Sequence, residues 1–163
     1  MAYLLGTLAG GEDIMTGHSD NVHYGALIEE GIKAAEEGNT LLALRLFNQV
    51  GSEKMSPLVL SYHGYCIAHE QRAFEKALEL SNKALQADRT HPLIYLNLGR
   101  IYMAAGYEKK AEQVFRRGIR CQRHPLLLRK LESISNRRRM LFPFLQRSNP
   151  LNVISGKLFS KFS

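Results

Sequence analysis

The hydrophobic and small residues of the chain recur at a long, nearly constant interval. Alanines return every 34 residues, at Ala43, Ala77 and Ala111. Large residues return at nearly the same interval, at Leu27, Leu60 and Tyr95. A period of this length is typical of a stack of similar structural units, in which each unit buries its apolar face only against its neighbours.

Three segments of the chain also begin alike, with a proline followed by a leucine. The prolines are Pro57, Pro92 and Pro125. Proline is well suited to the first position of a helix, because the N–H that it lacks has no partner there in any case. Ser56, just before the first of them, is a favourable N-cap residue. The pattern therefore predicts that three helices begin at equivalent points of the repeat.

Each unit is predicted to contain two antiparallel helices in an all-α fold. The expected helices span about 24–37, 40–51, 57–70, 74–87, 92–105 and 108–121. Small residues recur where the two helices of a unit approach closely, at Gly31, Gly64 and Gly99. Gly38 and Gly106 stand where a tight turn joins the two helices, and Gln71-Arg72 replaces that glycine in the middle unit.

With these features the chain resembles the tetratricopeptide repeat family. The third unit carries most of the signature positions, at Tyr95, Leu98, Gly99, Tyr102, Gly106, Ala111 and Phe115. The second unit departs from the pattern at Ser81, where the family has an aromatic residue. The resemblance implies a right-handed α-solenoid of antiparallel helix pairs, with three units at about 24–56, 57–90 and 91–123.

The segments outside the three units have their own patterns. Residues 125–139 have leucines and an isoleucine at helical spacing, which predicts a helix that caps the open end of the stack. Residues 1–22 are expected to form a flexible N-terminal arm. Residues 140–163 form a basic and apolar tail that we expect to fold back on the capping helix or into the groove, and that resembles the end of some small bacterial tetratricopeptide proteins.

In this family the first helices of the units line a concave groove that holds a peptide. Transferred position by position, the resemblance implies groove residues Ile28, Ile32, Ser61, Tyr65, His69, Leu96, Arg100 and Met103. Such a surface suits a peptide or helix of a partner protein with apolar anchors and an acidic group for Arg100. The chain would then act as an adaptor, scaffold or co-chaperone. The alternative is that its own tail partly covers these side chains.

The charge distribution suggests a second binding surface. Residues 1–99 hold 7 Lys/Arg and 12 Asp/Glu, whereas residues 100–163 hold 15 and 3. The basic patch consists of Arg116, Arg117, Arg120, Arg129, Lys130, Arg137, Arg138 and Arg139. It could anchor the protein on an anionic surface, which could be an acidic protein, a membrane or nucleic acid, or it could be a solvated face. No motif for specific nucleic-acid recognition is present.

Candidate catalytic and metal-binding groups are few. His18, Asp20 and His23 lie close together in the sequence, but a polar arm explains them better than a metal site. Cys66 and Cys121 have neither metal-binding nor redox spacing and are expected to be free thiols. No apolar run is long enough to cross a membrane. We therefore expect a cytoplasmic protein with no cofactor, no metal and no enzymatic activity.

Overall fold

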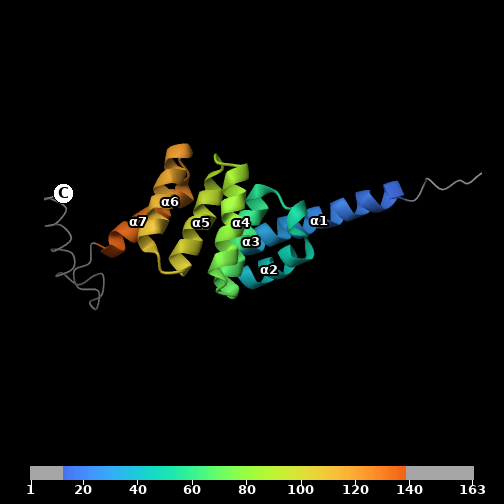
Figure 1. Cartoon of the computed structure of the whole chain (residues 1–163), viewed down its shortest axis with the longest axis horizontal. Coiled ribbons are helices and arrows are strands. Elements are labelled where there is room, and N and C mark those ends of the chain that lie inside the picture. The colour runs from blue at the N-terminus through green and yellow to red at the C-terminus, as the bar shows by residue number, and fades with distance from the viewer. Residues whose placement is uncertain (1–12, 139–163) are drawn as a thin grey trace, which may run out of the picture. The chain divides into compact units, whose positions relative to one another are not determined.

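The computed structural model describes the backbone of residues 13–138 and the side chains of residues 23–136. Within that range the chain forms seven α-helices and one 3-10 turn, and no strand (Figure 1). The helices are α1 (Asp13–Glu36), α2 (Thr40–Gln49), α3 (Pro57–Glu70), α4 (Phe74–Ala87), α5 (Pro92–Ala104), α6 (Glu108–Cys121) and α7 (Pro125–Arg138). The 3-10 turn is η1 (Ser52–Lys54). The prediction of an all-α fold is confirmed.

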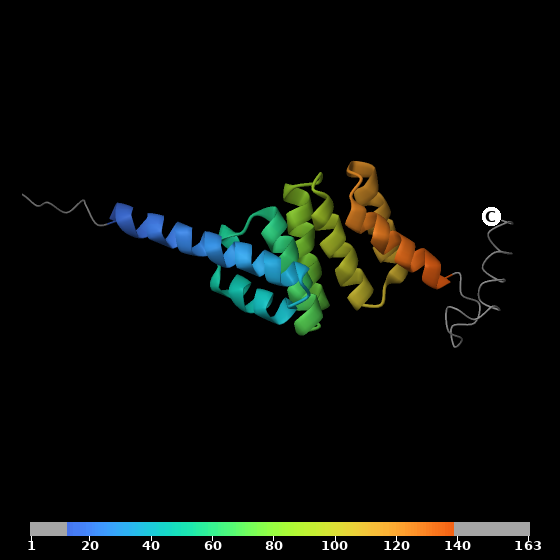
Figure 2. The same ribbon diagram turned by 180° about the vertical axis from the view of Figure 1, so that it is seen from behind.

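The chain divides after Met55 into two units, which are described separately. In the first unit α2 packs against the C-terminal half of α1 (Figure 2). In the second unit α3 pairs with α4 and α5 pairs with α6, while α5 also packs against both α3 and α4. Helix α7 lies against α6. The helices therefore pack in sequential pairs, whereas the boundaries and right-handed stacking of three repeats stay predictions.

The prolines mark helix starts as the sequence predicts. The Ser56 hydroxyl accepts a hydrogen bond from the backbone N–H of Val59 at 3.4 Å, which caps α3. At α5 the same role falls to His91, whose Nδ1 accepts from the N–H of Leu93 at 3.3 Å. Before α7 the Nδ1 atom of His124 accepts from the N–H of Leu126 at the same distance. A histidine ring can thus satisfy one of the unpaired N–H groups at a helix start.

The first helix is longer than the sequence analysis expected. It begins at Asp13 rather than at about residue 24, so residues 13–22 are helical, and the flexible arm at 1–22 stays a prediction. No proline interrupts this segment. Because each residue added to an existing helix gains one hydrogen bond, an uninterrupted helix extends more easily than a new one forms. Residues 1–12 and the tail at 140–163 lie outside the described residues.

The turns within the three helix pairs have one common backbone geometry. Gly38 and Gly106 have positive φ angles of 89° and 82°. Arg72, in the middle pair, also has a positive φ, at 56°. This left-handed region is open to glycine, but for a residue with a Cβ it costs about 1–2 kcal/mol. The arginine therefore holds a conformation that glycine would adopt without strain.

The two helices of each pair lie close together at a glycine. A Cβ on Gly31 would lie 2.6 Å from the Phe47 ring, and a Cβ on Gly99 would collide with the Phe115 ring. Ser81 takes the place of the ring in the α3–α4 pair. There a Cβ on Gly64 would lie 2.8 Å from the backbone oxygen of Ala77 and 2.9 Å from the Ser81 hydroxyl. With no ring between them, α3 and α4 meet through the Ala77 backbone.

The core of the second unit extends under the capping helix. Tyr95, Leu96 and Phe115 are buried in one cluster with Leu127 and Ile134 of α7. The Tyr95 hydroxyl donates a hydrogen bond to the backbone oxygen of Arg89 at 2.7 Å, so this buried polar group is paired. Helix α7 therefore closes the apolar end of the α5–α6 pair, as expected of a cap.

The α3–α4 contact leads to a stability prediction. We expect Gly64→Ala to lower the free energy of unfolding by about 1–3 kcal/mol, because the new methyl group meets a backbone atom that cannot rotate away. The matched control is Ser81→Ala, which removes a buried hydroxyl without a hydrogen-bond partner and leaves the contact in place. That change should be neutral or stabilising by up to about 1 kcal/mol. Urea unfolding measures both, and equal stability of Gly64→Ala and the wild type would contradict this packing.

His63 leads to a prediction about pH. Burial, with a smaller contribution from the charge of Lys76, lowers the pKa of His63 to about 4. In the unfolded chain the pKa returns to about 6.5, so the unfolded state binds the proton more readily between these values. The stabilisation is complete above about pH 6.5 and is lost as the pH falls to about 4, by at most about 1.4 kcal/mol per pH unit. Urea unfolding from pH 7.5 to 4.5 should show this slope, and His63→Gln should reduce it; an unchanged slope would exclude His63 as its source.

Candidate partner-binding face

The neighbouring helices α3 and α5 are joined by a buried hydrogen bond. The Asn97 side chain on α5 donates from Nδ2 to the Ser61 hydroxyl on α3, at 3.0 Å. Ser61 in turn donates to the backbone oxygen of Leu58 at 2.7 Å. Both side chains are fully buried, so each needs the partners that the other helix and the backbone supply.

Asn97 also holds a cation at the surface. The Arg100 guanidinium donates from one terminal nitrogen to the Asn97 Oδ1 atom at 3.2 Å. Its central carbon lies 5.0 Å from the centre of the Tyr65 ring, which is a cation–π distance. Arg100 is half-buried, and no acidic side chain among the described residues forms an ion pair with it. The guanidinium is therefore held in place with its charge available to a ligand.

Two of the groups around Arg100 carry no charge at neutral pH. Burial raises the pKa of Tyr65, against an opposing effect of Arg100. Burial also raises the pKa of the Cys66 thiol, to about 12. Both groups are therefore neutral. The nearby Glu70 is exposed and accepts a hydrogen bond at 2.8 Å from His69 when that ring carries its proton on Nδ1.

The residues predicted to line the groove differ in exposure, and the groove itself stays a prediction. Tyr65, Arg100 and Met103 are half-buried and His69 is exposed, so these four side chains offer surface to a ligand. Ser61 and Leu96 do not, and this corrects the sequence-based interpretation. Ser61 is taken up by the bond to Asn97, and Leu96 packs in the core beside α7.

The remaining groove candidates lie on α1, and one further residue, Asn97, supports the face from within. Ile28 and Ile32 are half-buried on α1, in the first unit, and their part in a shared groove stays a prediction. Sequence reasoning missed the role of Asn97, which positions Arg100 from a buried site. The available signal was a lone amide inside the apolar run of α5.

The basic patch is exposed over α6 and α7. Arg117, Arg120, Arg129 and Lys130 are exposed. Arg116 is also exposed and forms an ion pair with Glu112 at 2.9 Å. Arg137 and Arg138 end α7, but their side chains, like Arg139, lie outside the described part of the chain.

Other kinds of site find little support between residues 23 and 136. No three His, Cys, Asp or Glu side chains gather there as a metal site would need. No helix of residues 13–138 combines the length and the apolar character needed to cross a membrane. Cys66 is buried and Cys121 is exposed, and both are free thiols.

Comparison with known proteins finds one family model and one fold that resemble this arrangement. Residues 68–132, from the end of α3 into α7, match the model of the tetratricopeptide repeat. No curated protein matches the chain significantly. A similar solved structure is the crystal structure of the Sgt2 TPR domain from Aspergillus fumigatus, with 20% identity, a TM-score of 0.55, and coverage of 78% of this chain and 85% of that one. That likeness concerns the fold, and the seven described helices fit three repeats and a cap. Residues 68–132 are therefore similar to a tetratricopeptide repeat, and the fold is that of a tetratricopeptide repeat domain.

Proposed function

We propose that this protein is a non-catalytic interaction module that binds a peptide or helix of a partner protein on the exposed face of α3 and α5. Tetratricopeptide repeat domains typically bind other proteins and are usually not catalytic. The observation that carries the proposal is Arg100, a half-buried cation held by Asn97 and Tyr65 without an acidic partner among the described residues. Such a module would serve as an adaptor, scaffold or co-chaperone.

The chemistry of this face indicates the kind of segment that would bind. A carboxylate of the partner can pair with Arg100, and a held guanidinium loses less conformational freedom on binding than a mobile one. Apolar side chains of the partner can pack against Met103 and the Tyr65 ring. The expected ligand is therefore a peptide or helix with apolar anchors and at least one acidic residue.

We also propose that the protein works in a reducing compartment, the cytoplasm. Cys66 and Cys121 are both free thiols. Unpaired cysteines persist where glutathione and thioredoxin keep thiols reduced. An exposed thiol such as Cys121 would be open to oxidation elsewhere.

Affinity capture from the source cell, with and without the charge of Arg100, tests the proposal. We expect Arg100→Gln to lose a specific partner that the wild type retains at about 500 mM salt, because a held charge in a partly buried contact is screened less than exposed ones. The matched control is Lys83→Gln, which removes an exposed lysine from α4 and should leave recovery unchanged. Circular dichroism checks that both variants are folded. Equal recovery by both variants would contradict the proposal.

A second candidate function rests on the exposed arginines of α6 and α7. Apart from Arg116 with its partner Glu112, the basic patch residues with described side chains have no ion-pair partner among those residues. Such a surface could anchor the protein on an acidic protein, a membrane or nucleic acid. In the same capture experiment, material lost at high salt and insensitive to Arg100→Gln would favour this function over the first.

A further inference from the structure

A pocket lies away from the Arg100 face, at the turns within the helix pairs. It has a volume of about 600 Å³. One wall is formed by residues 72–76 and Leu78, at the start of α4, and the other by Ala105 and Tyr107 in the α5–α6 turn. Tyr65 and Arg100 do not line it, so it is separate from the face proposed above.

Two aromatic rings line this pocket, and each has a cation over it. The guanidinium of Arg72 lies 5.2 Å from the centre of the Phe74 ring. The ammonium of Lys110 lies 4.9 Å from the centre of the Tyr107 ring. Tyr107 is 55% exposed, which makes it the most exposed large hydrophobic residue with a described side chain. Both rings therefore offer apolar surface beside a positive charge.

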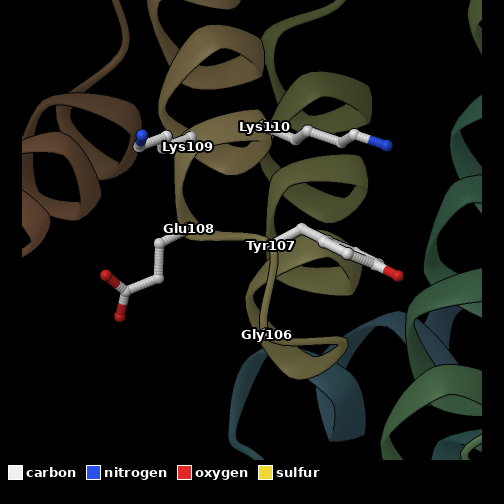
Figure 3. A pocket seen from close by; sticks show the side chains of 5 residues that line it. All are labelled: Gly106, Tyr107, Glu108, Lys109 and Lys110. Atoms are coloured by element: carbon white, nitrogen blue, oxygen red, sulfur yellow. The ribbon is translucent and has the colours of Figure 1, made fainter.

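The side chains of the α5–α6 turn divide between two sides. Figure 3 shows a neighbouring pocket of about 480 Å³, lined by residues 106–110, where Tyr107 and Lys110 extend to one side and Glu108 and Lys109 to the other. Of these five residues, Tyr107 is the one that also lines the pocket of about 600 Å³. Because Lys109 and Lys110 extend to opposite sides, replacing Lys109 serves as the control for replacing Lys110.

The pocket has an excess of positive charge. Arg72 and Lys76 line it and Lys110 stands beside it, whereas Glu75 is the acidic residue in its lining. None of the three cations forms an ion pair with a described side chain. An acidic ligand would therefore meet charges that the surrounding residues leave uncompensated.

The backbone at Arg72, in the lining of this pocket, is strained. Arg72 has a φ of 56°, in the region where the other two turns place Gly38 and Gly106. Arginine is less favourable than glycine at this φ, but its guanidinium lines the pocket. Backbone strain of this kind is concentrated at binding and catalytic sites.

We propose that this pocket docks a segment of a partner protein that carries an aromatic side chain flanked by acidic residues. The partner's ring would enter between Phe74 and Tyr107, and its carboxylates would pair with Arg72, Lys76 and Lys110. Glu75 favours a peptide over nucleic acid, because its carboxylate can accept hydrogen bonds from backbone N–H groups, which a nucleic-acid backbone lacks. The second unit would then hold a partner at two separate places.

A fluorescein-labelled peptide, Gly-Glu-Asp-Phe-Asp-Glu-Gly, tests this site by fluorescence anisotropy with the full chain. We expect saturable binding that is weakened about fivefold or more by Lys110→Ala and unchanged by Lys109→Ala. Arg72→Gly should weaken binding by a similar factor without lowering the urea midpoint of unfolding, because glycine relaxes the turn. A peptide with glycine in place of phenylalanine should not bind.

Four results would overturn the proposal. They are an absence of binding in the millimolar range, equal loss with Lys109→Ala and Lys110→Ala, loss with Arg100→Gln but not Arg72→Gly, and displacement of the peptide by oligo(dT). Equal loss with the two lysine variants would indicate general charge attraction. Loss with Arg100→Gln alone would place the peptide on the α3–α5 face, and displacement by oligo(dT) would indicate a nucleic-acid site. Because Tyr65 and Arg100 are intact in the Lys110→Ala variant, failure here leaves the function proposed for α3 and α5 separately testable.

Discussion

The close approach of two helices at a glycine is the contact on which the rest of this structure depends. Gly31 and Gly99 each face the ring of a buried phenylalanine, whereas Gly64 faces the backbone of the opposite helix. Since a methyl group at any of the three would meet an atom already in place, the pairing of the helices is fixed at these points. Fixed pairs give the side chains of α3 and α5 defined positions relative to one another.

The middle helix pair departs from its neighbours in two ways, and both have consequences for the surface. Ser81 replaces an aromatic ring, which lets α3 and α4 meet through their backbones. Arg72 replaces the glycine of the turn, which puts a guanidinium over Phe74 in the lining of the pocket between the α3–α4 and α5–α6 turns. The repeat that matches the family pattern least well therefore contributes to both surfaces for which we propose ligands.

Much of the fold could be predicted from spacing alone. The bounds of α3, α4 and α6 agree with those expected from the prolines and the 34-residue interval, because both features are local and strong. The start of α1 could not be predicted, since residues 13–22 carry neither a proline nor a clear apolar stripe. The groove positions transferred from the family include Tyr65 and Arg100, which are partly exposed in the structure. They also include Ser61 and Leu96, which are buried. Burial at those positions depends on Asn97 and α7, which differ from one repeat to the next.

The preorganisation of Arg100 is the central claim of this account, and ¹⁵N relaxation of the arginine Nε groups tests it most directly. Held by Asn97 and by the Tyr65 ring, the Arg100 side chain should show clearly restricted motion in the intact protein. Arg120, exposed on α6, provides the internal reference for a mobile guanidinium. A higher order parameter for Arg100 than for Arg120 is the predicted result. Equal mobility of the two would contradict the claim that this face presents a fixed cation to a partner.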